Sequence, residues 1–342
     1  MSRTVLVTGG SGYFGNVLAE AALARGDKVK IFDLEAPVED IDSEVVRGDV
    51  RDREAITAAC AGVDVVFHNV AQVPLAKDSA LFWSVNVLGT ANVLLAARDA
   101  GVAKVVHTSS SAIFGIPEHN PVTETTPGRP LEAYGRAKLE AEGLCHDAAA
   151  AGLDVSIIRP RTILGHGRLG IMAILFEFVA EGAPVFVLGG GHNRYQFVYA
   201  SDLAEATLLA GDRPGAETYN IGAAHPSTMR ETITALTDHA ATGSKVRSLP
   251  AGPAAAAMRS LAGAGLVPFA PYHWLLYAES LWFDTTKAET QLGWRSTRSN
   301  GEMLVESYEW FLAHRNELAS RHGSHHQSPV RLGALKVLKA LP

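Results

Sequence analysis

The sequence predicts an α/β fold with a doubly wound parallel sheet and a smaller C-terminal lobe. Two patterns predict the sheet. Up to about residue 160, short apolar runs alternate with helix-like segments, which is typical of a parallel sheet covered by helices on both faces. A glycine cluster also follows the first apolar run, where a dinucleotide-binding sheet needs one. The alternation ends after residue 160, and this change predicts the second lobe.

Composition favours a folded chain with a sizeable core. The 342 residues are 47% hydrophobic and 19% charged, and the net charge of -6 gives no reason to expect a nucleic-acid partner. The two cysteines fit neither a disulfide framework nor a metal-ligand pattern. We therefore predict no metal site and a reducing, cytoplasmic location. We expect neither a signal peptide nor a membrane span, because the chain starts directly with a strand and its apolar runs look short.

The first strand, residues 5–7, leads into a glycine motif. Gly9, Gly12 and Gly15 form G-x-x-G-x-x-G before a helix over residues 16–25. Small residues there let the backbone approach a pyrophosphate, and the helix N-terminus favours the anion. The motif predicts a Rossmann-type site for a dinucleotide.

The next two strands end in carboxylates. Asp33 follows the strand at residues 28–32 and is placed to accept from both ribose hydroxyls of an adenosine. It would repel a 2'-phosphate, and Glu35 adds to that field, so NAD is favoured over NADP. Asp49 follows the third strand. It either hydrogen-bonds an adenine amine or caps a helix over residues 51–61.

Three more strands complete the predicted sheet, at residues 63–68, 105–107 and 155–158. The second of these ends in a cluster of hydroxyls, residues 108–111, where a substrate oxygen could meet them. Asn86 lies in a long helical stretch, near the expected cofactor. Later elements are expected at residues 171–181, 184–187, 197–199, 219–222, 229–238 and 301–313. Asp202 should cap a helix to residue 210, and residues 251–266 are of uncertain order.

Tyr134 and Lys138 carry the catalytic hypothesis. Residues four apart on a helix share one face. An ammonium beside a phenol favours the phenolate and lowers the tyrosine pKa. Tyr134 is therefore a candidate acid/base for a carbinol oxygen.

With these motifs the chain resembles the extended short-chain dehydrogenase/reductase family, in its NAD-dependent epimerase/dehydratase branch. The matching segments are residues 8–15, Asp33, Asp49-Val50, Asn86 with Gly89-Thr90, residues 109–115, Tyr134 with Lys138, Arg159-Pro160, residues 283–288 and residues 292–294.

The resemblance implies a role for each matching residue. Tyr134 would be the acid/base, Lys138 would hold the nicotinamide ribose, and Ser110 would bind the substrate oxygen, with Ser109 and Ser111 as fallbacks. Asn86 would belong to the catalytic site, and Ser111 and Arg194 to the substrate site. The residues implied to hold NAD are Gly9, Gly12, Tyr13, Phe14, Gly15, Asp33, Asp49, Val50, Val70, Ala71, Tyr134, Lys138 and Pro160.

Nucleotide-sugar epimerisation or dehydration is the leading activity that the resemblance implies. Thr162, standing near where an asparagine is usual, weakens this reading, and Tyr199 replaces a histidine. Arg194, Arg168 and Arg295 are the phosphate candidates. The apolar, aromatic residues 269–277 favour a second reading, a 3β-hydroxysteroid dehydrogenase-like enzyme for a hydrophobic alcohol, if they do not simply pack in the lobe. A non-catalytic NAD-binding protein is the third.

The expected organisation has three parts. Residues 1–160 form the NAD-binding domain, to which residues 195–222 return, and residues 161–315 form the substrate lobe. Residues 316–342 form a histidine-containing linker and a basic amphipathic tail, which would dock on the protein itself or a partner, or lie on a membrane surface. The family resemblance also implies a homodimer formed through the helices that hold Asn86 and Tyr134.

Overall fold

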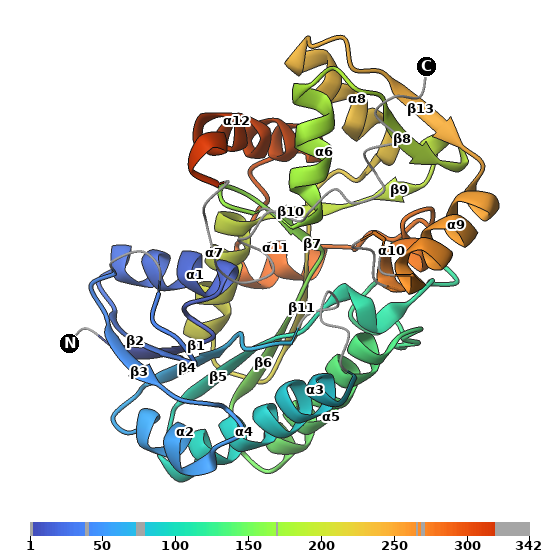
Figure 1. Cartoon of the computed structure of the whole chain (residues 1–342). Coiled ribbons are helices and arrows are strands. Elements are labelled where there is room, and N and C mark those ends of the chain that lie inside the picture. The colour runs from blue at the N-terminus through green and yellow to red at the C-terminus, as the bar shows by residue number, and fades with distance from the viewer. Residues whose placement is uncertain are drawn as a thin grey trace.

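The computed structural model describes residues 3–37, 41–72, 79–168, 170–264, 266–267 and 271–318. Within them, one parallel sheet of seven strands has the order β11-β6-β5-β4-β1-β2-β3 (Figure 1). Its strands are β1 (Thr4–Thr8), β2 (Lys28–Asp33), β3 (Glu44–Arg47), β4 (Val65–His68), β5 (Lys104–Thr108), β6 (Val155–Pro160) and β11 (Thr218–Ile221). The predicted α/β class with a Rossmann-type sheet is confirmed.

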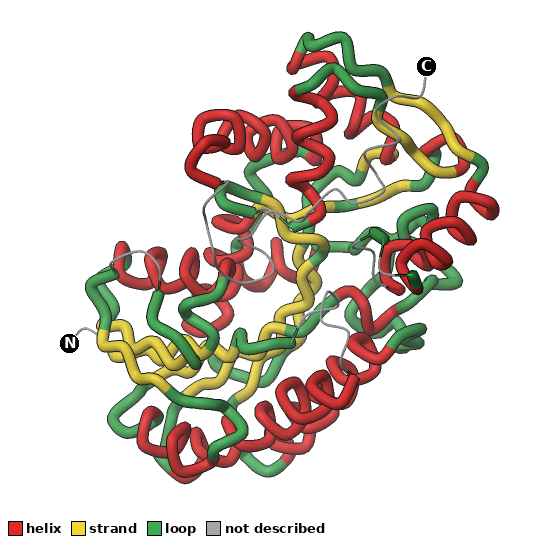
Figure 2. The backbone as a smooth tube through the Cα atoms, in the orientation of Figure 1, coloured by secondary structure: helices red, strands yellow, loops and turns green. Residues whose placement is uncertain are grey.

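Helices cover both faces of this sheet, as Figure 2 shows. One face carries α1 (Tyr13–Ala24), α7 (Ala200–Asp212) and α11 (Thr286–Leu292). The other carries α2 (Arg53–Ala59), α3 (Ser79–Trp83), α4 (Gly89–Asp99) and α5 (Ala133–Ala150). A π turn, η1 (Ser84–Leu88), joins α3 to α4, and a 3-10 turn, η2 (Ser111–Phe114), follows β5.

Two apolar cores fill the space between sheet and helices. Successive strand residues point to opposite faces, so Val5 and Val7 pack toward α1 and α7 while Leu6 packs toward the other face. All three side chains are fully buried. Apolar strands with no polar face are expected of a parallel sheet covered on both sides.

The smaller lobe is built from the later half of the chain. Short strand pairs join β7 (Thr162–Leu164) to β10 (Phe197–Tyr199), β8 (Val185–Leu188) to β13 (Val246–Leu249), and β9 (Arg194–Tyr195) to β12 (Ser227–Thr228). Its helical elements are α6 (Ile171–Ala180), η3 (Gly189–Gly191), α8 (Met229–Ala240), α9 (Ala251–Gly263), α10 (Pro271–Leu276) and α12 (Asn300–Leu318). The alanine-rich segment of uncertain order thus contains a helix, α9.

One capping expectation is wrong, and one of the two roles left open for Asp49 is excluded. α2 begins at Arg53, and its N-cap is Asp52, whose carboxylate accepts from the amides of Glu54 and Ala55. Asp49 therefore does not cap α2. Asp202 lies inside the first turn of α7, which begins at Ala200 without a side-chain cap.

The expectation about apolar runs also needs correction. Residues Ala80–Asp99 form a helical stretch that is long and apolar enough to cross a membrane by length and composition. Half of it is buried inside the fold, and Val93 and Leu94 belong to the core beside the sheet. Such a pattern also characterises the core helix of a folded domain.

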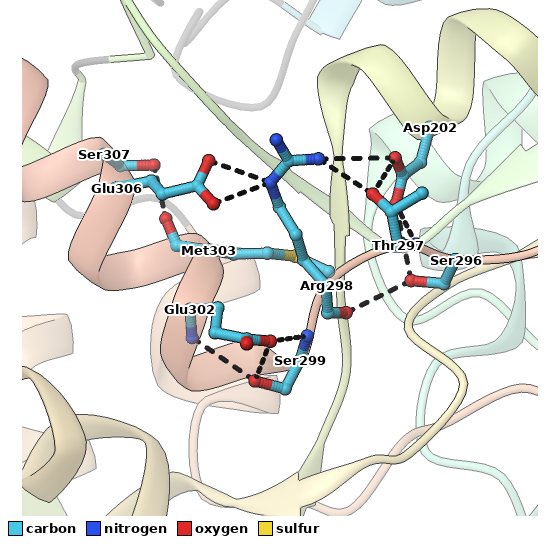
Figure 3. A network of polar contacts seen from close by, with 9 residues as sticks. All are labelled: Asp202, Ser296, Thr297, Arg298, Ser299, Glu302, Met303, Glu306 and Ser307. Carbon is cyan, nitrogen blue, oxygen red and sulfur yellow. Dashed lines mark hydrogen bonds and ion pairs between the residues drawn. The ribbon is translucent and has the colours of Figure 1, made fainter.

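The carboxylate of Asp202 joins α7 to the segment that leads into α12 (Figure 3). It accepts from the amide and hydroxyl of Thr297, at 2.8 and 2.7 Å, and lies 3.7 Å from Arg298 Nη1. Arg298 Nε in turn lies 2.8 Å from both carboxylate oxygens of Glu306. The indole of Trp294 donates to the backbone carbonyl of Asp202. This network attaches a helix of the large sheet to a helix of the lobe.

We predict that Asp202→Ala lowers the free energy of unfolding by about 1–3 kcal/mol, because it removes the acceptor of two Thr297 donors and one of the two carboxylates that face Arg298. Urea unfolding at neutral pH measures the change. Asp238→Ala, which removes an exposed carboxylate from α8, is the control and should cost less than about 0.5 kcal/mol. Equal losses in the two variants would contradict the assigned role of Asp202.

Candidate active site

The predicted site residues gather at the carboxyl edge of the large sheet. The strand order reverses there, since β2 lies on one side of β1 and β4 on the other. Loops leaving neighbouring strands in opposite directions open a crevice at such a point, and ligands of open α/β sheets bind in it. The loops after the first six strands, together with η1 and the start of α5, supply most of the residues described below.

The glycine loop after β1 is shaped for close backbone approach. Gly9 has φ +73°, and a Cβ built on it would lie 2.9 Å from the backbone nitrogen of Val70. A Cβ on Gly15 would lie 2.0 Å from the carbonyl oxygen of Gly9. Only glycine fits at either position, so the loop and the start of α1 form a tight backbone cradle. This cradle fits the pyrophosphate of a dinucleotide.

Asp33 stands beside the cradle at the end of β2. Its carboxylate accepts from the amides of Ser11, at 3.0 Å, and Leu34, at 2.7 Å. Burial raises the pKa of Asp33, and these two hydrogen bonds oppose the rise. The structure therefore places the acidic group against the glycine loop, where an adenosine ribose would be recognised.

The neighbouring predicted residues have different surroundings. The Tyr13 ring is buried, and its hydroxyl has no hydrogen-bond partner among the described residues. Phe14 packs into the core between α1 and the sheet, so only its backbone can serve a ligand. Asp49 forms an ion pair with Arg51, which lowers the pKa of Asp49. Val50 is buried against Gly89 at the start of α4.

Asn86 is buried in the π turn and acts on the loop after β4. Its Oδ1 accepts from the amide of Gln72 at 2.8 Å, and its Nδ2 donates to the carbonyl of Gln72 at 3.1 Å. These two bonds fix the end of the loop that contains Val70 and Ala71. Asn86 is thus placed as a positioning residue for the loop against the glycine cradle.

Tyr134 and Lys138 lie in the first turns of α5, on the side that faces the sheet. Glu132 caps this helix by accepting from the amides of Tyr134, at 2.7 Å, and Gly135, at 2.6 Å. The Lys138 ammonium is 1% exposed and donates to the carbonyl of Thr108 at 2.6 Å. Burial lowers the pKa of Lys138 to about 8. The Phe82 ring packs edge-on against Tyr134.

The three serines after β5 are not equivalent. Ser110 is half-buried and caps η2 by accepting from the amide of Ala112. Ser109 is buried, and its hydroxyl has no partner among the described residues. Ser111 is buried and accepts from Arg161 Nη1 at 2.7 Å. Ser110 is therefore the most accessible of the three for a substrate oxygen.

Two histidines missed by the sequence reasoning lie beneath this site. His68 is the last residue of β4 and pairs in register with His107, the residue before the end of β5. Their ring centres are 5.2 Å apart. His68 is hydrogen-bonded to the hydroxyls of Thr8 and Thr90. Burial and the charge of Lys138 lower the pKa of both histidines, so they are neutral. The sequence could have indicated both histidines, because each is a polar residue at the end of an apolar run.

The three candidate phosphate-binding arginines have different surroundings. Arg168 is half-buried, with its guanidinium carbon 5.4 Å from the centre of the Tyr13 ring. Burial lowers its pKa to about 10, and the hydroxyls of Tyr13 and Tyr134 oppose that lowering. Arg168 is thus a cation near both tyrosines. Arg194 is exposed beside the Trp282 ring, and Arg295 is exposed.

A family model described as "NAD dependent epimerase/dehydratase family" matches residues 5–222. The match covers the glycine loop, the large sheet and the residues at its carboxyl edge. The chain belongs to this family.

Three relatives show the range of this epimerase/dehydratase family. An uncharacterized protein, y4nG, of Sinorhizobium fredii is 48% identical and covers 98% of this chain and 85% of its own length. UDP-glucose 4-epimerase of Mycolicibacterium smegmatis is 32% identical over 68% of this chain and 80% of that protein. The human sterol-4-alpha-carboxylate 3-dehydrogenase, decarboxylating, is 30% identical over 62% of this chain and 58% of that protein.

Solved structures of the family have the same fold. UDP-glucose 4-epimerase of Thermotoga maritima, solved with UDP-glucose, has a TM-score of 0.77 at 23% identity and covers 91% of this chain and 99% of its own. The Thermus thermophilus UDP-glucose 4-epimerase in complex with NAD has a TM-score of 0.74 at 28% identity, over 90% of this chain and 99% of that one.

The buried lysine gives a pH test of the site. Between about pH 8 and its ordinary value of 10.5, Lys138 is deprotonated in the folded chain and protonated in the unfolded chain. The unfolded state then binds more protons, so the free energy of unfolding rises with pH. From pH 7 to 9 this contribution should be about 1 kcal/mol.

Urea unfolding of wild type and Lys138→Met at pH 7 and pH 9 isolates that contribution, because the other titrating groups are shared. The wild type should gain about 1 kcal/mol relative to the variant. Lys28→Met, at an exposed position, should follow the wild type. A Lys138→Met profile parallel to that of the wild type would show that the lysine titrates normally.

Proposed function

We propose that this chain is an NAD-dependent enzyme that transfers a hydride at a secondary alcohol or ketone. The observation that carries the proposal is the placement of Lys138. Its ammonium is bonded to the end of β5, one helical turn from Tyr134 and close to the serines of η2. The glycine cradle, the acid/base Tyr134 and the serine hydroxyls after β5 therefore lie at the same edge of the sheet.

The side chains divide the chemistry among them. The glycine cradle and Asp33 would hold NAD, which would supply the hydride acceptor for the carbinol carbon. Tyr134 takes the proton of the substrate hydroxyl, and the charges of Lys138 and Arg168 favour its phenolate form. Ser110 donates a hydrogen bond that orients the substrate oxygen. In the reverse direction Tyr134 returns the proton.

A nucleotide sugar is the substrate class we propose. The similarity to UDP-glucose 4-epimerases supports it, in sequence at 32% identity and in fold with a TM-score of 0.77. Arg168 adds a cation near the site that suits an anionic substrate. An epimerase of this kind would return its hydride to the sugar, so it would convert the sugar nucleotide without accumulating NADH.

A dehydrogenase for a hydrophobic alcohol is the second candidate, and the similarity to the sterol-4-alpha-carboxylate 3-dehydrogenase favours it. The aromatic segment at residues 269–277 gives it less support. Its first two residues lie outside the described part of the chain, and Trp274 and Tyr277 pack against the core of the lobe. Accumulation of NADH with an added sterol or other hydrophobic alcohol would identify this activity.

We also propose that the enzyme is a cytoplasmic homodimer. Trp83 and Leu88, on the helical stretch that holds Asn86, are 50% and 52% exposed. Large apolar side chains exposed on neighbouring turns suit a self-association surface. The tail at residues 319–342, for which a docked or membrane-surface helix was expected, lies outside the described residues.

Tyr134→Phe tests the acid/base role. The variant keeps the ring and loses the hydroxyl, so turnover of the nucleotide sugar should fall by at least about a thousandfold. The dissociation constant for NAD, measured by calorimetry, should change less than about threefold. A large loss of NAD binding would instead assign Tyr134 a structural role in the cofactor site.

Cofactor preference tests Asp33. The wild type should bind NAD at least about tenfold more tightly than NADP, because the Asp33 carboxylate repels a 2'-phosphate. Asp33→Ser should reduce that ratio to about one or below. Fluorescence titration with both cofactors gives the ratios, and tighter wild-type binding of NADP would refute the role of Asp33.

A further inference from the structure

Arg161 has an unsatisfied hydrogen-bonding edge beside the serines of η2. The side chain is 2% exposed, and its Nη1 donates to Ser111. Nε and Nη2 are both buried and have no hydrogen-bond partner among the described residues. A buried guanidinium with two unused donors carries a large desolvation cost.

The two unused nitrogens form one edge of the guanidinium. Nε–H and one Nη2–H of an arginine point the same way, and this pair matches the two oxygens of a carboxylate. Arg159, two residues earlier, uses the same edge in that manner. Its Nε and Nη2 donate to the two Glu142 carboxylate oxygens at 2.9 and 2.6 Å.

The surroundings of Arg161 hold the guanidinium in place. Its carbon lies 4.6 Å from the centre of the Tyr195 ring and 5.7 Å from that of Phe283. Tyr195 is fixed in turn by a 2.7 Å hydrogen bond between its hydroxyl and that of Thr162. Both aromatic residues belong to segments after residue 190, whereas Ser111 lies in η2, just after β5 of the large sheet. Arg161 therefore lies where the two parts of the molecule meet.

We propose that Arg161 and Ser111 form a subsite that binds a carboxylate of the substrate. This inference rests on the proposed function, because it takes Ser110 as the partner of the reacting oxygen. Ser111 follows Ser110 directly, so the subsite lies close to the reacting carbon. In a sugar nucleotide, a carboxylate beside the reacting carbinol meets this requirement, whereas the diphosphate lies across the sugar ring. The substrate is then a sugar acid rather than a neutral sugar.

UDP-glucose and UDP-glucuronic acid are the matched probes, since they share the nucleotide and diphosphate and differ by one carboxylate. Calorimetry with the NAD-loaded protein should show that the wild type binds UDP-glucuronic acid at least about tenfold more tightly than UDP-glucose. Arg161→Gln should abolish this preference and change the affinity for UDP-glucose less than about threefold. Arg247→Gln, at an exposed position on β13, should keep the preference.

Equal affinity of the wild type for the two probes would overturn the proposal, and so would a preference that survives in Arg161→Gln. A parallel loss of affinity for both probes would assign Arg161 to the diphosphate, which also overturns it. Should Arg161→Gln not fold, Arg161→Lys, which keeps the charge without the two-pronged edge, and Ser111→Ala should each reduce the preference.

A second readout separates this inference from the nucleotide-sugar proposal. Sodium formate should raise the melting temperature of the wild type above that in sodium chloride at equal ionic strength, and Arg161→Gln should lose the difference. If Arg161→Gln loses this difference and the wild type converts neither sugar nucleotide, the subsite is supported and nucleotide-sugar chemistry is refuted. Equal formate effects in the two proteins, or stabilisation by inorganic phosphate in place of formate, overturn the subsite even if a sugar is converted.

Discussion

The buried Lys138 ammonium is the constraint on which the arrangement of the site depends. Placing a charge inside a protein is costly unless it is compensated. Here its hydrogen bond goes to a backbone carbonyl, that of Thr108, rather than to a carboxylate. The positive charge is therefore left to act on its neighbours. Together with burial, it lowers the pKa of His68 and His107 and keeps both rings neutral. In the proposed mechanism the same charge favours a phenolate at Tyr134, so the geometry of α5 against β5 would serve the chemistry as well as the packing.

A helix cap, a π turn and a glycine fix the relative positions of the parts of the site. The Glu132 cap fixes the first turn of α5, where Tyr134 lies. The π turn directs Asn86 at the loop after β4, and Gly9 allows that loop to approach the glycine cradle. π turns of this kind are frequent at functional sites. None of these three elements needs to contact the substrate. In the proposed mechanism the first positions the acid/base, and the other two position the loop and the cradle that would hold NAD.

The sequence was sufficient for the sheet and insufficient for the partners of polar side chains. Apolar periodicity and the glycine spacing depend on neighbours along the chain, so they predicted the strand sequence and the cradle. Capping was one of two roles left open for Asp49, and the structure gives that role to Asp52, because the helix begins two residues later than the expected residue 51. Asp202 was predicted to cap α7 because its actual partners, Thr297 and Arg298, lie about a hundred residues later in the sequence. The open edge of Arg161 was invisible for the same reason, since its neighbours come from segments far apart in sequence.

Arg159 and Arg161 show how the fold separates structure from recognition within three residues. Alternate residues of an extended segment point to the same side, so both guanidiniums approach η2, one over Phe114 and the other at Ser111. Glu142 on α5 neutralises Arg159, and that pair lies entirely within the large sheet and its helices. Arg161 meets aromatic rings from the later segments, which supply packing and no negative charge. Beside Arg159 the fold supplies a carboxylate, whereas no described residue pairs with Nε or Nη2 of Arg161. The missing negative charge is therefore best supplied by a ligand that enters between the two parts of the molecule.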